Sequence, residues 1–476
     1  MSALPQLDFS GLKDAKARVV GVMSFKKNFV MSSAANFALA AIGTATGILA
    51  ARLLGPQGRG ELAAITAFSG TVSAIALVGV PNALIYYAAR TPKRSSSYLV
   101  AGGLIAIAAA VPFALGAYFC IPVLLAHQRA GVIWAARIYV FQIAVYLFAS
   151  SPGEVLRGAG HFRQWNVLRV APRILVLSIY GLAWVLRIRA AEFIAIGNIV
   201  AGALMVFPLW YWLLPVLQGP PRPTLQQGQE ILRFSLPTVF TMLPKSLNLG
   251  LDQIVMSAML PAPMLGLYVA AVSWSASSGL LLQAVGNTLF PHIASITDDT
   301  ARSKSLARAI RLTTLIAVVM MLVFLAATPV AVPLLFGRSF VRSVPAGLVL
   351  VIAGLFAGLN MVLEEGIQGL GHPTAILRAE IVGLAVTVVA LAALLKPLQI
   401  MGAAIASLLT YATVTAVLLY QVRELTGLGT SDFICPGMSD LRYSWLGIRT
   451  SLANLGQRFD RANDLGACPS NTKSRV

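Results

Sequence analysis

The feature that most constrains the fold of this chain is a long succession of apolar segments, each about as long as one bilayer crossing. An α-helix needs roughly 20 apolar residues to span a membrane. Hydrophobic residues make up 57% of the chain and charged residues 11%, against about 25% charged in a soluble domain. The sequence therefore predicts an all-α polytopic membrane protein. Its twelve predicted spans are residues 30–51, 62–89, 98–126, 132–150, 165–186, 190–217, 234–258, 264–290, 310–336, 344–368, 373–395 and 398–420.

The chain also repeats itself. Residues 154–161 and 365–372 share the pattern E-x-x-x-G-x-G-H. The loop at 54–60 corresponds in the same way to the loop at 260–266, and each opens an apolar segment. Because each half has an even number of predicted spans, both halves enter the membrane from the same side. The repeat is then parallel, and two such halves with a polar site between them are typical of alternating-access transporters.

The distribution of lysine and arginine predicts the orientation. Most of the 36 basic residues lie at the amino terminus, in the carboxy-terminal tail and in loops on that same side, and such a bias marks the cytoplasmic face. We therefore predict that both termini are cytoplasmic. The predicted units are a basic N-terminal segment (1–29), a six-helix bundle (30–217), a cytoplasmic linker (218–233), a second six-helix bundle (234–420) and a cytoplasmic tail (421–476).

The charge and cysteine content exclude several classes of partner. The net charge of +19 is spread along the inner loops, so it predicts contact with anionic membrane lipids and not with nucleic acid. The three cysteines have neither metal-ligand nor disulfide-framework spacing. No G-x-x-x-x-G-K-[ST] loop for nucleotide binding occurs in the sequence. We expect no metal and no cofactor, and we expect a monomer.

The tail contains an amphipathic pattern near residues 440–460. Apolar residues at 441, 445, 448, 452, 455 and 459 lie on one helix face, and arginines flank them. Two interpretations fit this spacing equally. The helix lies on the anionic inner leaflet or docks a partner, or it packs on the inner face of the protein itself.

The seventh predicted span carries a stripe of polar side chains. Thr238, Thr241, Lys245, Asn248 and Asp252 recur every three or four residues and so share one helix face. Ionisable residues inside a span are costly and often mark a substrate or ion pathway. We interpret Lys245 as the cation for an anionic headgroup, and Asp252 as its counter-ion or a protonatable coupling group. The alternative is a pair that only holds helices together.

Other ionisable residues are weaker candidates. Arg137 lies one turn into the fourth span, where it either binds a phosphate or extends to the interface. Glu154 lies at the inner end of the fourth span, and Glu364 and Glu365 lie at the inner end of the tenth. They form a gate with basic residues of the other half, or they are surface charges at glycine-terminated helix ends. The basic candidates for the gate are Arg157, His161 and His372.

Five short motifs occur in order along the predicted spans: RLLGPQGRG (52–60), LRGAGHF (156–162), GLYVAA (266–271), LFG (335–337) and GAAIA (402–406). Over residues 30–420 the chain resembles bacterial polysaccharide biosynthesis membrane proteins, the O-antigen type (Wzx-like) flippases of the multidrug/oligosaccharidyl-lipid/polysaccharide exporter superfamily. The resemblance implies a V-shaped pair of six-helix bundles in the inner membrane. It implies flipping of undecaprenyl-pyrophosphate-linked oligosaccharide for surface polysaccharide assembly, by alternating access driven by an ion gradient. Polysaccharide polymerase or assembly proteins are implied partners.

Three alternative functions stay open. An ion-coupled drug or small-molecule antiporter of the same superfamily would share the architecture, although residues 30–51 contain no ionisable group, unlike the first span of drug exporters and of lipid II flippases. A membrane glycosyltransferase or polymerase would be expected to need a large outer loop or a cluster of acids. Neither occurs in the sequence, so we expect that the chain is not an enzyme. The third alternative is a scaffold for a polysaccharide assembly complex, and only the predicted tail helix favours it.

Overall fold

The computed structural model of this chain describes residues 10–76, 79–279 and 298–429, together with positions 282, 286, 289, 293, 296 and 433. This part is almost entirely α-helical and contains no strand. Its first helices are α1 (Ser10–Ala76), α2 (Val80–Arg90), α3 (Ser95–Leu124), α4 (Ala130–Tyr139), α5 (Gln142–Gly158), α6 (Phe162–Val185), α7 (Ala191–Leu204) and α8 (Val206–Leu213). The later ones are α9 (Leu225–Asn248), α10 (Leu251–Met259), α11 (Ala262–Ser278), α13 (Asp299–Phe336), α14 (Val344–Gly369) and α15 (Pro373–Thr426). Short 3-10 helices, η1 (Pro92–Arg94) and η2 (Arg338–Ser343), precede α3 and α14.

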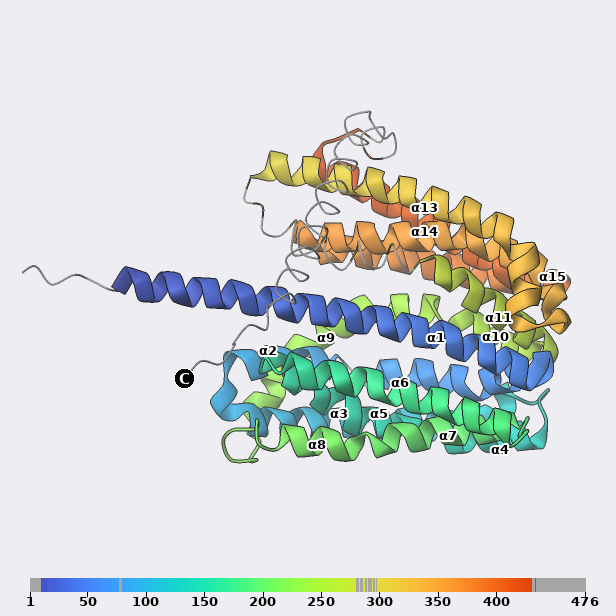
Figure 1. Cartoon of the computed structure of the whole chain (residues 1–476), viewed down its shortest axis with the longest axis horizontal. Coiled ribbons are helices and arrows are strands. Elements are labelled where there is room, and N and C mark those ends of the chain that lie inside the picture. The colour runs from blue at the N-terminus through green and yellow to red at the C-terminus, as the bar shows by residue number, and fades with distance from the viewer. Residues whose placement is uncertain are drawn as a thin grey trace, which may run out of the picture.

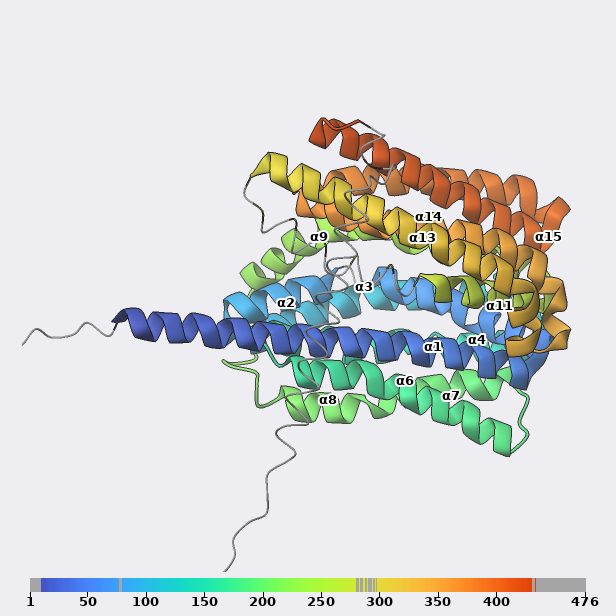
Figure 2. The ribbon, with the colours of Figure 1, turned by 45° about the horizontal axis from the view of Figure 1, so that its top comes forward.

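The helices lie side by side in two groups (Figure 1). Helices α2 to α8 form the N-terminal group, and α10 to α15 form the C-terminal group. Two helices connect them, because α1 packs on both α6 and α11, and α9 packs on α15 as well as on α2 and α3. The turned view in Figure 2 shows the same division, with α15 and α8 on opposite sides of the molecule.

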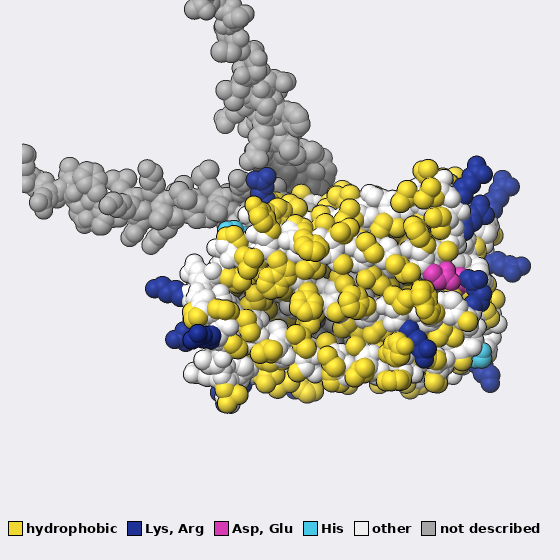
Figure 3. Space-filling view, turned by 90° about the horizontal axis from the view of Figure 1, so that it is seen from below, with side chains coloured by type: hydrophobic (Ala, Val, Ile, Leu, Met, Phe, Trp, Pro, Cys, Tyr) yellow, Lys and Arg dark blue, Asp and Glu magenta, His cyan; other side chains and the backbone are white. Residues whose placement is uncertain are grey.

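The helices share two ends and an apolar flank. We call the end that carries the segment 214–224 between α8 and α9 the linker end, and the opposite end, where α1 turns at Gly55, the hairpin end (left and right in Figure 1). Hydrophobic side chains cover the flank between them, while basic side chains gather at both ends (Figure 3). Eight segments of the described residues are long and apolar enough to cross a bilayer. The chain is therefore a multi-pass membrane protein.

Two of the longest helices are bent back on themselves at the hairpin end. In α1, Gly55 has φ 64° and ψ −175°, a conformation that glycine adopts at little steric cost. In α15, Gln399 has φ 48° and ψ −122°, two residues after Pro397. His372 and Thr426, at the two ends of α15, line one pocket at the linker end. Each of these helices thus consists of two antiparallel rods, and the breaks fall at boundaries predicted between apolar segments.

The repeated E-x-x-x-G-x-G-H pattern forms the same helix cap twice. Gly160, after α5, and Gly371, after α14, have φ of 82° and 86°. The N–H groups of His161 and His372 donate to the carbonyls five residues earlier, at 2.8 and 3.2 Å. This is the Schellman motif, which satisfies the last carbonyls of a helix. Both caps lie at the linker end, one beside α2 and the other beside the start of α13.

Candidate functional site

At the hairpin end, two glycines bring α1 and α11 into direct backbone contact. A Cβ atom at Gly60 would lie 1.7 Å from the carbonyl oxygen of Ala262, and one at Gly266 would lie 1.9 Å from that of Pro56. The contact is reciprocal. Pro56, four residues before Gly60, touches Gly266, and Ala262, four residues before Gly266, touches Gly60. Beside it, the Gln128 side chain donates to two carbonyls at the end of α10, at 3.2 and 3.3 Å. The hairpin end is closed by these contacts.

At the linker end, the N-terminal group contacts the connecting helix α9 through polar side chains. The Tyr98 hydroxyl donates to Glu230 at 2.5 Å, and the Gln227 amide donates to Ser97 at 2.8 Å. Farther from this end, where α2 begins, a Cβ atom at Gly79 would lie 2.9 Å from a carbonyl oxygen of α9. These residues lie on α2, α3 and α9, and the sequence analysis did not identify them. Glu230 and Gln227 were assigned to the linker, whereas α9 extends through both.

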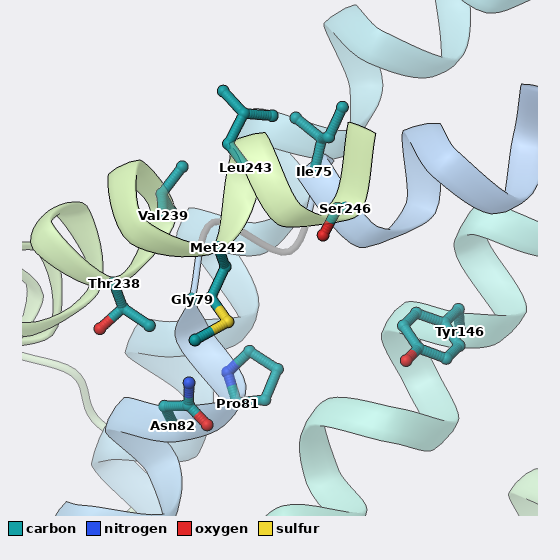
Figure 4. A pocket seen from close by; sticks show the side chains of 10 residues that line it. All are labelled: Ile75, Gly79, Pro81, Asn82, Tyr146, Thr238, Val239, Met242, Leu243 and Ser246. Carbon is teal, nitrogen blue, oxygen red and sulfur yellow. The ribbon is translucent and has the colours of Figure 1, made fainter. Parts of the chain in front are cut away.

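Between the two closed ends lies a pocket of about 230 Å³ at the junction of α2, α5 and α9. In Figure 4, Thr238 and Met242 of α9 lie opposite Pro81 and Asn82 of α2, and Tyr146 projects from α5. Tyr146 also lines a larger cavity on its other side. The junction pocket therefore adjoins the interior of the N-terminal group.

The larger cavity has a volume of about 700 Å³ and is lined by α1 and by α4 to α8. From α6, it is lined by Trp165, Arg169, Arg173 and Tyr180. Their spacing places these side chains on one face of the helix. Because α6 begins at Phe162 at the linker end, the two arginines lie about two and three turns into the helix. We call this space the arginine cavity.

The two arginines differ in their contacts. Arg169 donates to the Asn36 side chain at 2.9 Å, and its guanidinium lies 4.4 Å from the ring centre of Trp165. The Arg173 side chain is exposed in the cavity and makes no hydrogen bond or ion pair with any residue in the described part of the chain. Cations at membrane depth are costly unless they meet an opposite charge. Glu154 also lines the cavity, but its carboxylate is paired with Arg157, so the cavity is suited to an anion at Arg173.

Sequence reasoning missed both arginines. They were counted among the basic residues of an inner loop, although both fall inside the predicted segment 165–186. That position within a span was the signal that identifies them.

Two predicted site residues, Lys245 and Asn248, belong to a network in the C-terminal group. Lys245 of α9 forms an ion pair with Glu364 of α14; their side chains are 39% and 8% exposed. The Asn248 amide donates to the Glu380 carboxylate at 2.6 Å, and its carbonyl oxygen accepts from Thr387 at 3.1 Å. Asn248 is buried against α15 by these bonds and does not face the space between the groups.

Asp252 is not the counter-ion of Lys245, which corrects one interpretation of the polar stripe. Helix α9 ends at Asn248 and α10 begins at Leu251. The stripe argument assumed one regular helix, and this break takes Asp252 off the shared face. Its carboxylate accepts instead from the Tyr268 hydroxyl at 2.5 Å.

The predicted acidic gate is not formed between the groups in this conformation. Glu154 accepts from Trp165 at 3.2 Å and pairs with Arg157 at 3.5 Å, both within the N-terminal group. Glu364 is paired with Lys245, and Glu365 beside it is half-buried. The linker-end contact is made by the tyrosine and glutamine bonds of α3 and α9.

The remaining predictions fall elsewhere. Arg137 lies on the membrane-facing side of α4, over the ring of Tyr118 at 4.9 Å, and does not line the arginine cavity. Thr238 lines the junction pocket. The side chain of Thr241 and the amphipathic tail pattern at 440–460 lie outside the described residues.

These features define a helical membrane protein of two helix groups, with contacts that close both ends and a basic cavity inside the N-terminal group. A family model described as polysaccharide biosynthesis protein matches residues 48–345. The chain belongs to this family, which confirms the resemblance found in the sequence motifs. A search of curated protein sequences found no match.

Solved structures share the fold. The lipid II flippase MurJ in an inward closed conformation matches with a TM-score of 0.70 and 13% identity, over 85% of this chain and 89% of that one. An inward-facing multidrug resistance MATE family transporter of the MOP superfamily matches with a TM-score of 0.60 and 14% identity, over 83% and 95%. The MATE multidrug transporter DinF-BH matches with a TM-score of 0.59 and 15% identity, over 86% and 97%. The chain therefore has the fold of MOP-superfamily transporters.

Proposed function

We propose that this protein flips undecaprenyl-pyrophosphate-linked oligosaccharide across the bacterial inner membrane for surface polysaccharide assembly. The observation that carries the proposal is the arginine cavity, where Arg173 is exposed and forms no ion pair with any residue in the described part of the chain. A pyrophosphate cannot cross hydrocarbon unaided, because burying its charges without partners is prohibitively costly. A cationic, hydrated path through the helices removes that barrier while the lipid tail stays in the bilayer. In this proposal the protein moves its substrate without altering it, so it is not an enzyme.

In this proposal the chain has twelve spans in two parallel bundles, residues 30–217 and 234–420. Eight apolar segments are present among the described residues, and two of them, Met31–Ser73 and Pro373–Thr426, each contain a break and enough length for two crossings. Helix α9 with α10 supplies one more, and the predicted span 264–290, of which α11 is the described part, supplies the twelfth. The reciprocal contact of Gly60 and Gly266 supports an approximate two-fold relation between the halves.

The proposed orientation places the linker end in the cytoplasm. Reporter fusions at Gly337 and Lys396, at the hairpin end, should report an external position, and those after Arg94 and Thr300 an internal one. Basic residues lie at both ends, but the sequence assigns most of the 36 to the side of the linker end, and this bias provides the physical reason. Alkaline phosphatase and green fluorescent protein fusions measure the two outcomes. An internal signal from Gly337 would overturn the orientation.

The C-terminal network fits the role of an ion-coupling site. Glu364, with Lys245, and Glu380, with Asn248, are acids held within one helix group. Asp252 with Tyr268 adds a third acid. Protonation or cation binding there would alter pairs that connect α9 to α14 and α15, and α9 forms contacts at the linker end. We propose that ion binding in the network shifts α9 and so opens that end.

Replacing Arg173 by alanine should lower transport of the lipid-linked sugar about 10- to 150-fold, because a hydrogen bond to a charged group contributes about 1.5–3 kcal/mol. Arg173→Lys should retain part of the activity by keeping the charge. Arg163→Ala is the matched control, since Arg163 is an exposed arginine of the same helix that does not line the cavity. Purified protein in liposomes with undecaprenyl-pyrophosphate-linked oligosaccharide gives the rates.

Recovery of the glycan by mass spectrometry separates transport from chemistry. An unchanged glycan in the outer leaflet supports a flippase, whereas a lengthened or shortened glycan indicates an enzyme. Export of organic cations that is insensitive to Arg173→Ala would favour the antiporter alternative. Wild-type flipping by the Arg173→Ala protein would exclude this arginine from substrate binding.

A further inference from the structure

A second cavity, of about 730 Å³, opens on the membrane-facing flank between α3 and the α4–α5 pair. Its lining is almost wholly apolar and includes exposed aromatic side chains: Trp134 is 57% exposed, Phe141 63% and Phe148 47%. We call this cavity the flank slot. Aromatic and aliphatic surface of this kind faces lipid in a protein that spans the membrane.

Arg137 is the one charged side chain among the described residues that line the flank slot. Its guanidinium lies 4.9 Å from the ring centre of Tyr118, which also lines the slot. Its Nε atom is buried, with no hydrogen-bond partner in the described part of the chain. A cation over an aromatic face gains some electrostatic stabilisation, but its N–H donors still need acceptors. The slot therefore holds an unneutralised charge within an apolar surface.

The position of Arg137 matches the shape of a lipid. The slot is lined on α3 from Ile107 to Tyr118 and on the α4–α5 pair as far as Phe148. Each stretch of eleven steps, 107–118 and 137–148, is about 17 Å long at roughly 1.5 Å per residue. That is about half of a hydrocarbon core of roughly 30 Å, the depth of one leaflet. Arg137 is at the end of the slot nearer the hairpin end, because α4 begins there at Ala130.

We propose that the flank slot binds one anionic phospholipid, with its phosphate on Arg137 and one acyl chain along the apolar groove. A single guanidinium matches the single charge of a phosphodiester, and its planar N–H groups suit phosphate oxygens. An oligosaccharide head would need hydrogen-bonding groups, whereas the slot is lined mainly by aliphatic and aromatic residues. A phospholipid with a compact, net-negative head is the occupant whose charge and length both fit.

The bound lipid would press on the wall of the arginine cavity. The same broken span separates the two spaces: Tyr139, Gln142 and Tyr146 line the arginine cavity, while Ile138 and Phe141 line the slot. Helix α4 ends at Tyr139 and α5 begins at Gln142, so the break lies between the two cavities. An acyl chain in the slot would pack against the interruption between α4 and α5 from the membrane side. The lipid site does not depend on which substrate the protein transports.

Native mass spectrometry of the full-length, delipidated protein tests the site by titration with phosphatidylglycerol and, separately, with phosphatidylethanolamine. The wild type should retain one phosphatidylglycerol more tightly than phosphatidylethanolamine. Arg137→Leu should bind it about tenfold more weakly or worse, since a charge-assisted contact is lost. Ala114→Phe should weaken binding as well, because Ala114 lines the slot and the larger side chain fills it. Arg338→Leu is the control, an exposed arginine at the hairpin end outside the slot.

Each other outcome contradicts the proposal. Equal binding by wild type, Arg137→Leu and Ala114→Phe would show that lipid adheres elsewhere. If Ala114→Phe weakened phosphatidylglycerol binding and Arg137→Leu did not, the slot would be an apolar groove without a phosphate site. Tight retention of undecaprenyl pyrophosphate but not of phosphatidylglycerol would assign the slot to the transported lipid. If Arg137→Leu fails to fold, the affinities of the two phospholipids for the wild type and for Ala114→Phe still test whether the slot binds an anionic phospholipid.

Discussion

Gly60→Ala should abolish transport while leaving both helix groups folded. The added Cβ would lie 1.7 Å from the Ala262 carbonyl oxygen, and backbone cannot move aside as a flexible side chain can. Overpacking of this kind costs typically 1–3 kcal/mol, and the cost falls only on the conformation in which α1 and α11 touch. The population with a closed hairpin end should therefore fall about 5- to 150-fold relative to the open one.

Pulsed electron paramagnetic resonance between spin labels at positions 187 and 338 measures this shift. Both are exposed arginines at the hairpin end, one in each helix group, and the three native cysteines are replaced by serine. The labels should move apart in Gly60→Ala and in Gly266→Ala. Gly43→Ala is the matched control, because a Cβ at this glycine of α1 meets nothing within 4 Å. An unchanged distance distribution in Gly60→Ala would contradict the closing role of the glycine contact.

The sequence predicted the all-helical membrane fold because length and hydropathy alone decide whether a segment can cross a bilayer. It also located the turns. The breaks at Gly55 and Gln399 lie beside Pro56 and Pro397, residues that interrupt helices for local reasons. The repeated glycine pattern also reflects a local rule, because a Schellman cap requires a residue with positive φ and glycine adopts that conformation most easily. Local rules of this kind need no knowledge of tertiary contacts.

The pairing of the polar residues could not be predicted in this way. Lys245 and Glu364 are 119 residues apart, and no local spacing connects them. Lys245 and Asn248 of the stripe lie in one network of ion pairs and hydrogen bonds, whereas the break before Leu251 removes Asp252 from that face. Arg169 and Arg173 were misassigned because a charge near a span end is ordinarily a loop charge. Their position inside the predicted span 165–186 was the one sequence signal, and the cavity beside α6 distinguishes them from such charges.

The two polar regions lie in different helix groups, which separates the proposed tasks of substrate binding and coupling. The arginine cavity belongs to the N-terminal group, and the acids around Lys245 belong to the C-terminal group. Helix α9 contacts both, through Thr238 at the junction pocket and through Lys245 at Glu364. A shift of α9 caused by ion binding at the C-terminal network can therefore change the contacts of the same helix at the linker end. Coupling of this kind requires that both sites bias the same two-state element.

Lys245→Ala should destabilise the protein by about 3 kcal/mol and lower its folded yield. Removing one partner of a buried ion pair typically costs about 3–5 kcal/mol, because the other charge is left uncompensated. Here that charge is Glu364, which is only 8% exposed. The Lys245 side chain is 39% exposed, so water already screens part of the pair, and the lower end of the range applies. Lys245→Arg should keep most of the stability, since the charge remains.

The double variant Lys245→Met, Glu364→Gln separates packing from coupling. Removing both charges should restore most of the stability, because no buried charge is left alone. Transport should nevertheless stay low, since the acid proposed to respond to the ion is gone. Thermal unfolding in detergent gives the stability, and ion-driven flipping in liposomes gives the activity, with the exposed Lys396→Ala as control. Recovery of transport together with stability would reduce the pair to a structural contact, and coupling would then have to reside in Glu380 or Asp252.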